Sequence, residues 1–502
     1  MTKFFIDQHG CAKNQVDGEL IISLLNKKEG YTQTFDPAEA DLIIVNSCGF
    51  IESAKTESLN AVISARQMYP KAKILLAGCL AERYANELKD TLTEADGFFG
   101  NGDLNQLYKV VEPLMNGERP VLTPPQAGVC GGDRNLLLSF PGAAYVKITE
   151  GCNNHCSFCA IPIIRGELRS RKADEIISEI KKLISEGIYE LNLIGQDLAA
   201  YGTGRTDNVF GTGRTSLPCG TPGTEFGTQN KDGESEESGL CTLLKMISKL
   251  EGTFRLRLLY IHPDHFNEDI LPVIKADERI LPYFDIPFQS GDTDVIHQMH
   301  RTGSRERYFE LIQKIRSYFP EAAIRTTFLA GFPGETDEQA QNTQSFLKEI
   351  RTDWSGCFPY SKEENTPAAA FKKPVPKKVS QARANALVET QAAITREKLS
   401  ERCGKDYDVL IEEVLAENPE SPDEGIAIGR AWFQAPEVDG SVVINYDRGN
   451  EKENNAVKTG RLVRVHVYSS GDVDLNGEFV CDSPLNDKIC ESKLAFAQNE
   501  NL

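Results

Sequence analysis

Short apolar runs alternate with helical segments along most of this 502-residue chain, and that alternation limits its possible folds more than any other feature. Near the N-terminus, segments with helical periodicity separate three such runs, KFFID, DLIIVNS and KILLAG, at residues 3–7, 41–47 and 73–78. This pattern predicts a parallel sheet with crossover helices. We therefore expect an α/β domain over residues 1–125.

The alternation restarts near residue 143. Six further candidate strands follow one another, most of them separated by helical segments: YVKITEG, ELNLIGQD, RLRLLYI, YFDIPF, IRTTFLAGF and DWSGCFPY. Six β/α units fit an open or partial (β/α) barrel, which places its chemistry on the loops after the strands. We expect this barrel to occupy residues 140–375.

A glycine-rich segment at residues 202–239 interrupts the barrel pattern. It has nine glycines, carries GTGRT twice and shows almost no apolar periodicity. We interpret it as a disordered insertion on a barrel loop. Neither copy of GTGRT completes a G-x-G-x-x-G fingerprint, so we expect no phosphate site there.

Beyond the barrel, the sequence predicts a helix and a small β domain. A basic, proline-containing segment leads into a linker helix, which we assign to residues 376–403. The runs YDVLIEEV, GIAIGRAW, SVVINY and LVRVHVYS follow, and they predict a small β-barrel over residues 404–475. We assign residues 476–502 to a polar tail and expect the stretch after Phe479 to be loosely ordered.

Charge and cysteine content narrow the function classes. The net charge of −19 disfavours non-specific binding to nucleic acid and suits a basic partner. The chain has no apolar run of about 18 residues and no apolar segment at its N-terminus, so we expect a cytoplasmic protein without a membrane span. In that compartment, 13 cysteines favour metal binding or catalysis over disulfides.

The segment EGCNNHCSFCAIP holds Cys152, Cys156 and Cys159, here called the loop trio, in a C-x-x-x-C-x-x-C run directly after the first barrel strand. Thiolates are the ligands of iron–sulfur clusters, and three of them leave one iron of a 4Fe-4S cluster open. A zinc knuckle that includes His155 is one alternative, but zinc sites usually use C-x-x-C pairs. A ferredoxin-like carrier would need a fourth cysteine nearby, which this segment lacks.

Three other cysteines share a local setting although they are far apart in the sequence. Cys11, Cys48 and Cys79, here called the sheet-edge trio, each lie a few residues beyond one of the N-terminal apolar runs. The carboxyl ends of the strands in an open α/β sheet line up along one edge, where ligands bind. The three thiols are therefore expected to converge at that edge.

Together these motifs resemble those of the radical S-adenosylmethionine (SAM) methylthiotransferases. The loop trio has the signature spacing of radical SAM enzymes, and HGCAKNQVDGE, NSCGFIESAKTES and AGCLAERY resemble the family's three N-terminal cysteine motifs. The resemblance implies that the loop trio holds a 4Fe-4S cluster whose open iron binds SAM. It also implies that the sheet-edge trio holds a second, auxiliary 4Fe-4S cluster, and that the C-terminal barrel is a substrate-recruiting TRAM domain.

Within this family, the sequence resembles the RimO type, which modifies the β-carbon of an aspartate in small-subunit ribosomal protein S-twelve. CAIPIIRGELRSR, LIGQDLAAYG and FLAGFPGETDEQ are similar to that type, and Asp197 stands where tRNA-modifying enzymes more often have Asn. Two positions differ from that type: Ser290 stands where His is common, and Gly18 stands where Ser is usual. Residues 404–470 carry 13 acidic and 7 basic side chains, a balance that suits a basic ribosomal protein better than tRNA.

The resemblance also implies a mechanism. With one electron from a reducing donor, the loop-trio cluster cleaves SAM to a radical that removes hydrogen from the substrate carbon, and the auxiliary cluster carries the sulfur. Gln196, Asp197 and Gln289, which follow candidate strands, are candidates for lining the SAM cavity, and Arg165 for meeting the SAM carboxylate or the substrate. Two alternatives stay open: a tRNA methylthiotransferase of the MiaB type, and a non-catalytic iron–sulfur protein that binds ribosomes.

Overall fold

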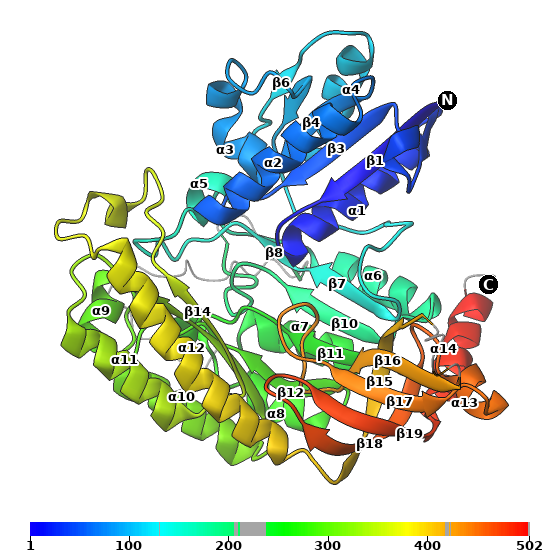
Figure 1. Ribbon diagram of the computed structural model, residues 1–502, viewed down its shortest axis with the longest axis vertical. Helices are drawn as coiled ribbons and strands as arrows, with labels where there is room; N and C mark the ends of the chain where they lie inside the picture. Colours follow the sequence, from blue (N-terminus) through cyan, green and yellow to red (C-terminus); the bar gives the residue numbers. More distant parts are fainter. Residues whose placement is uncertain (130, 205–208, 211–236, 417–420, 422, 500–502) are drawn as a thin grey trace.

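The computed structural model describes residues 1–129, 131–204, 209–210, 237–416, 421 and 423–499. The chain has three parts: an N-terminal parallel sheet, a central partial barrel and a C-terminal closed barrel (Figure 1). This arrangement confirms the α/β fold class expected from the sequence.

The N-terminal part is a six-stranded parallel sheet in the order β2-β1-β3-β4-β5-β6. Its strands are β1 (Thr2–Gln8), β2 (Tyr31–Gln33), β3 (Leu42–Ser47), β4 (Lys73–Gly78), β5 (Gly97–Phe99) and β6 (Val121–Leu122). Its helices are α1 (Ala12–Lys27), α2 (Glu52–Met68), α3 (Cys79–Leu88) and α4 (Tyr108–Met115). The three expected runs correspond to β1, β3 and β4. The sequence does not predict the other three strands, because two or three residues are too few to show a period.

Helix α1 is buried on almost every side although its sequence is rich in polar residues. Lys13, Asn14, Asp17 and Glu19 are all buried. The helix lies between the N-terminal sheet and the central barrel, where it packs against β7 (Ala143–Lys147) (Figure 1). Its polar side chains are therefore available to join the two parts.

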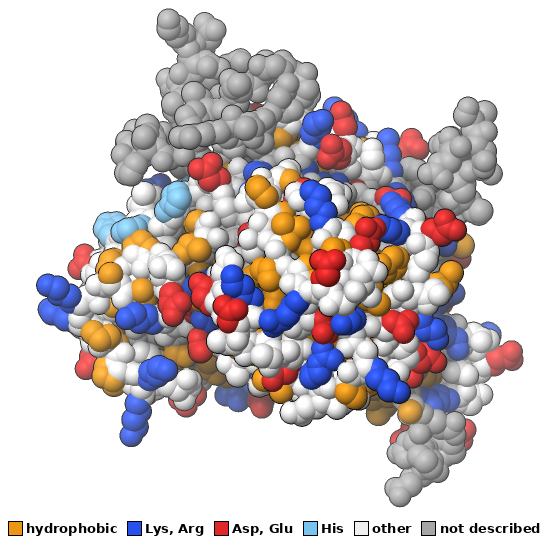
Figure 2. Space-filling view, turned by 90° about the horizontal axis from the view of Figure 1, so that it is seen from above, with side chains coloured by type: hydrophobic (Ala, Val, Ile, Leu, Met, Phe, Trp, Pro, Cys, Tyr) orange, Lys and Arg blue, Asp and Glu red, His pale blue; other side chains and the backbone are white. Residues whose placement is uncertain are grey.

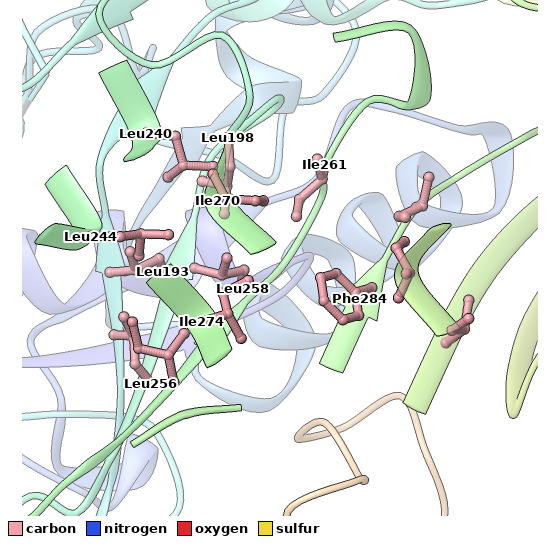
Figure 3. Close-up of a cluster of buried hydrophobic side chains, with 14 of the residues drawn as sticks. Leu193, Leu198, Leu240, Leu244, Leu256, Leu258, Ile261, Ile270, Ile274 and Phe284 are labelled. Carbon is pink, nitrogen blue, oxygen red and sulfur yellow. The ribbon is translucent and has the colours of Figure 1, made fainter. Parts of the chain in front are cut away.

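The central part is a parallel sheet in the order β14-β13-β12-β11-β10-β7, and all six expected strands are present. Besides β7, its strands are β10 (Glu190–Ile194), β11 (Arg255–Leu258), β12 (Ile280–Asp285), β13 (Ala323–Ala330) and β14 (Trp354–Pro359). The helices that follow its strands include α6 (Ala173–Ser185), α7 (Gly239–Ser248), α8 (Ile270–Ala276), α10 (Arg305–Tyr318) and α11 (Asp337–Ile350). Figure 3 shows Leu193, Leu256 and Leu258 of the strands among Leu244 and Ile274 of the helices. Full burial of such a side chain contributes about 1.5–3 kcal/mol.

The C-terminal part is a closed barrel in the order β15-β16-β17-β19-β18. Its strands are β15 (Lys405–Val414), β16 (Glu424–Arg430), β17 (Val442–Asp447), β18 (Leu462–Ser470) and β19 (Leu475–Asp482). Residues 476–482, assigned to the polar tail, belong to β19, which pairs with β17 and β18. The expectation of loose order after Phe479 is wrong for the described residues, since β19 continues to Asp482 and α14 (Leu485–Asn499) packs against α6. Only Leu475 and Gly477 of β19 are buried, so the strand depends on backbone pairing that its polar sequence does not reveal.

Buried ion pairs and one long helix join the C-terminal barrel to the central one. Glu190 of β10 pairs with Arg255 and Arg257 of β11 and, across the boundary, with Arg430 of β16. Helix α12 (Lys377–Ser400), within the segment 376–403 expected to be a linker helix, packs along β13 and β14 and reaches β18. The linker helix is therefore also a packing element.

Most of the segment 202–239, expected to be a disordered insertion, lies outside the described residues. Two residues in its middle are described and contact the barrel. Val209 accepts a hydrogen bond from the backbone N–H of Ala173 over 2.9 Å, and Phe210 packs edge-on against Tyr201. The segment is therefore attached to the barrel at an internal point.

Charged side chains of both signs are interspersed on the face seen in Figure 2. Among the helices that the structure describes, none is both long enough and apolar enough to cross a membrane.

Candidate functional site

The sheet-edge trio lies at the carboxyl ends of three adjacent parallel strands. β1 pairs with β3, and β3 pairs with β4. Cys48 and Cys79 directly follow β3 and β4, and Cys11 caps the start of α1, just after β1. The structure thus brings the three thiols to the edge that the strand phase predicts.

Two glycines let the segments that carry these cysteines approach one another. Gly10 has a φ of 89°, and a Cβ there would lie 3.1 Å from the Cβ of Cys48. A Cβ on Gly49 would lie 2.7 Å from the carbonyl oxygen of Cys79, closer than real side chains come. The missing side chains therefore allow the three strand ends to pack together.

Positive charge lies beside the thiols of the sheet-edge trio. Burial raises the pKa of Cys79 to about 12, and the guanidinium of Arg165 opposes that shift. Burial also acts to raise the pKa of Cys11, but Lys13 and Arg165 outweigh it and the pKa is lowered. The Sγ of Cys79 accepts hydrogen bonds from Asn101 Nδ2 and Arg165 Nη2, both over 3.3 Å. Such donors and cations favour the thiolate, the form that binds iron.

The loop trio lies between β8 (Thr149–Glu150) and α5 (Ile161–Arg165). At the start of the loop, Gly151 has a φ of 74°, and a Cβ there would lie 2.1 Å from the carbonyl oxygen of Glu167. Ser157 fixes the loop to the end of α9 (Thr293–Gln298): its N–H donates to Met299 O over 3.0 Å, and its Oγ donates to Gln298 O over 2.8 Å. The backbone of the loop is therefore held before any ligand binds.

His262 is a neighbour of the loop trio that the sequence reasoning does not identify. Its Nε2 lies 3.8 Å from the Sγ of Cys156. The backbone N–H of Asp264 donates to its Nδ1 over 3.2 Å, so Nε2 carries the ring hydrogen and donates toward the sulfur. Burial, together with the charge of Arg301, lowers the pKa of His262 to about 3, and the ring is neutral. The sequence feature that could have identified His262 is its place in YIHPDHF, just after β11, where a barrel presents functional side chains.

Arg165 connects the two trios. It ends α5, the five-residue helix that follows the loop trio, and it contacts Cys79 of the sheet-edge trio. It also donates to Asn14 Oδ1 (2.5 Å), Asp17 Oδ2 (3.0 Å) and Glu150 Oε1 (2.6 Å). We expected Arg165 to meet the SAM carboxylate or the substrate, whereas the structure directs it to these four protein partners. Since a helix rises about 1.5 Å per residue, α5 is only about 7 Å long, and at its end Arg165 contacts Cys79.

Asp197, expected in the SAM cavity, is fully buried and occupied by protein donors. It accepts hydrogen bonds from Asn154 Nδ2 (3.1 Å), from His265 Nδ1 (2.7 Å) and from the backbone N–H of Ala199 and of His262. Asn154 belongs to the loop between Cys152 and Cys156. Asp197 is therefore placed to position the loop between Cys152 and Cys156.

The other candidate polar residues are more open to a ligand. Gln196 donates to Glu150 over 3.2 Å, and its Oε1 is buried without a hydrogen-bond partner among the described residues. Gln289 has a φ of 69°, its backbone bridges to β13, and its side chain is partly exposed. Ser290, which departs from the family pattern, is buried and bonded to Thr343 over 3.1 Å, a local packing role.

The two donor sets suit iron–sulfur clusters better than single metal ions. Every described cysteine is a free thiol. Among the described residues, no three His, Cys, Asp or Glu side chains meet closely enough to hold one ion. The cysteines of a cluster bind different irons, so they need not meet at one point. Two groups of three thiols beside buried cations therefore fit two such clusters.

Comparisons with known families and proteins agree over nearly the whole chain. Residues 3–100 match the family described as Uncharacterized protein family UPF0004, residues 146–347 the Radical SAM superfamily and residues 403–480 the TRAM domain. The chain is 50% identical to Ribosomal protein uS12 methylthiotransferase RimO of Treponema denticola, over 94% of this chain and 99% of that one. It is 36% identical to the protein of the same name from Bdellovibrio bacteriovorus, over 94% and 96%.

One solved structure has a similar fold. It is that of the radical S-adenosylmethionine methyltransferase TsrM from Kitasatospora setae with cobalamin and a 4Fe-4S cluster bound. The TM-score is 0.50 over 73% of this chain and 74% of that one, at 12% identity. At this identity the likeness concerns the fold alone.

Proposed function

This chain belongs to the RimO family of ribosomal protein uS12 methylthiotransferases, and on that basis we propose that it adds a methylthio group to the β-carbon of an aspartate in uS12. It is a radical SAM enzyme. The structural observation that supports the proposal is that both cysteine trios lie at the boundary between the N-terminal sheet and the central barrel, where Arg165, which follows the loop trio, contacts Cys79 of the sheet-edge trio. A reaction that uses a radical and a sulfur donor together needs the two close to each other.

Each trio would supply three thiolates to one 4Fe-4S cluster, the loop trio to the cluster that binds SAM and the sheet-edge trio to the auxiliary cluster. When bound, the clusters supply the electron for SAM cleavage and a site for the transferred sulfur. The chain's own residues hold this arrangement. Asn154 and His262 orient the loop, Arg165 offsets the charge of the sheet-edge thiolates, and Gln196 and Gln289 are our candidates for SAM contacts.

The partner is uS12, and the C-terminal barrel is its proposed docking domain. The excess of acidic side chains in residues 404–470 supports a basic protein partner over tRNA. A reducing electron donor completes the system. We place the reaction in the cytoplasm, because the substrate is a ribosomal protein and the described cysteines are free thiols.

The test is a direct comparison of two substrates. The chain is reconstituted anaerobically with iron and sulfide and incubated with SAM and dithionite, either with uS12 or with hypomodified tRNA. Mass spectrometry of both substrates is expected to show a methylthio group on one aspartate of uS12 and none on the tRNA. A gain on tRNA alone would overturn the proposed function, and the absence of deoxyadenosine would show that the chain is not a radical SAM enzyme.

A further inference from the structure

A buried lysine beside the sheet-edge trio reaches the central barrel. Lys13 stands two residues after Cys11, at the start of α1, and is 7% exposed. Its Nζ donates to the carbonyl oxygen of Gly195, directly after β10, over 3.0 Å, and lies 3.9 Å from the centroid of the Tyr260 ring. Lys13 therefore lies where the sheet edge that carries Cys11 meets the strand ends of the barrel.

Lys13 differs from Arg165 and Lys147, two other buried cations of this boundary, because it has no carboxylate partner. Arg165 and Lys147 each pair with both Asp17 and Glu150. Lys13 forms no ion pair within the described part of the chain. It contacts the carbonyl oxygen of Gly195 and the face of the Tyr260 ring. A buried ammonium is costly unless an anion accompanies it. The site is therefore suited to an anion from outside the described chain.

Tyr260 forms the platform beneath this ammonium in a backbone conformation that few residues adopt. Its φ is 68°, and its N–H donates to Asp285 Oδ2 over 3.1 Å, which helps to hold that conformation. Such strained residues concentrate at functional positions. An ammonium has three hydrogens, and Gly195 takes one of them, so donors remain for a ligand.

We propose that Lys13 binds the side-chain carboxylate of the substrate aspartate and thereby distinguishes aspartate from neutral side chains. This inference rests on the proposed function, which makes an aspartate of uS12 the substrate. The modified β-carbon is bonded directly to that carboxylate. A cation at this boundary that holds the carboxylate therefore also holds the reacting carbon beside the sheet-edge trio and at the strand ends of the barrel.

Substrate binding by Lys13 has to be distinguished experimentally from a second role, that of a counter-ion. In that second role the ammonium is only a counter-ion of the sheet-edge thiolates, since Lys13 stands two residues after Cys11. A counter-ion would change cluster content or stability. It would have no reason to change the preference between two forms of uS12 that differ at a single side chain.

The experiment measures the binding of uS12 to the anaerobically reconstituted full-length chain by titration calorimetry. Native uS12 is compared with a variant in which the target aspartate is asparagine. The chain is tested as native, Lys13→Met, Lys13→Arg and Lys71→Met. Lys71 is an exposed residue just before β4, at the opposite edge of the sheet from the trio, and it is the control. Iron content and the EPR spectrum are recorded on the same samples, and the binding series is repeated on cluster-free chains so that loss of iron does not obscure it.

The native chain and Lys71→Met are expected to bind the aspartate form at least about tenfold more tightly than the asparagine form, the size of a charged hydrogen bond. Lys13→Met is expected to bind both forms equally, and Lys13→Arg to keep part of the preference. An undiminished preference in Lys13→Met would overturn the inference, as would equal binding of both forms by the native chain. Failure of the native chain to bind or modify uS12 at all would instead overturn the proposed function.

Discussion

Arg165 Nη2 donates a hydrogen bond to the Sγ of Cys79 over 3.3 Å, so the helix that follows one cysteine trio reaches directly into the other. The contact links residues 86 positions apart in the sequence. Arg165 is buried together with Asp17 and Glu150, which pair with it. The boundary between the N-terminal sheet and the central barrel is therefore a charged site that belongs to both.

The substitution Arg165→Met is predicted to lower the free energy of unfolding by about 3–5 kcal/mol, because it leaves buried carboxylates without one of their cations. Urea unfolding of the cluster-free chain measures this effect. Arg396→Met is the matched control: Arg396 pairs with Asp472 at the surface, where both side chains are more than half exposed, and its loss is expected to change stability by less than about 1 kcal/mol. Equal effects of the two substitutions would contradict the role given to Arg165.

The substitution His262→Phe is predicted to lower the reduction potential of the loop-trio cluster. A donor to a cysteine sulfur stabilises the more negative, reduced cluster, and His262 Nε2 is such a donor to Cys156 at 3.8 Å. An EPR-monitored redox titration of the reconstituted protein measures the potential. His466→Phe, a change at a partly exposed histidine of β18, is expected to leave it unchanged. An unchanged or higher potential in His262→Phe would rule out the hydrogen bond.

The substitution Glu190→Gln is predicted to destabilise the junction between the central and C-terminal barrels by about 3 kcal/mol or more at neutral pH, since three buried guanidinium groups lose their shared anion. Burial acts to raise the pKa of Glu190, but Arg255, Arg430 and Arg257 outweigh it and hold the pKa well below its ordinary value of 4.5. The stabilisation by a carboxyl group with a lowered pKa is complete above that ordinary value and is lost as the pH falls toward the folded-state pKa.

The difference in stability between the native chain and Glu190→Gln is therefore expected to be largest near pH 7 and to narrow on acidification below about pH 4.5. Urea unfolding at several pH values measures it. Glu401→Gln is the control: the Glu401 side chain is 62% exposed and lies 3.7 Å from Lys398, so a small difference is expected at every pH. A difference for Glu190→Gln that grows on acidification would contradict the assignment.

The fold could be predicted from the sequence wherever the hydrophobic period extends over several residues. The six barrel strands and the strands before Cys11, Cys48 and Cys79 are of this kind. The hydrophobic period does not predict β2, β5 and β6, because these strands have only two or three residues. It also does not predict β19, whose backbone pairing closes a barrel although most of its side chains are not buried.

The candidate site shows the same division. The cysteines were identifiable because their spacing and their position after strands are local in the sequence. His262 follows β11, a position that the strand pattern could have marked, but its contact with Cys156 depends on how the barrel loops pack. The role of Lys13 and the direction of Arg165 depend on how α1 and α5 pack between the two parts of the chain, which no local sequence pattern shows.

We expect the two trios to act in one reaction with separate tasks, and variants of single cysteines test this division. Cys152→Ala removes a thiolate of the SAM-binding cluster and is expected to abolish SAM cleavage. Cys48→Ala leaves the loop trio intact and is expected to spare part of the cleavage. Iron analysis, with about eight irons per native chain when both clusters are present, shows which cluster each variant has lost.

The most direct measurement is the ratio of methylthiolated uS12 to deoxyadenosine formed by Cys48→Ala under reducing, anaerobic conditions. If the sheet-edge trio carries the sulfur, deoxyadenosine still appears while methylthiolated uS12 is lost. Full product formation by Cys48→Ala, at the ratio of the native chain, would show that the sheet-edge trio is structural and does not take part in sulfur transfer.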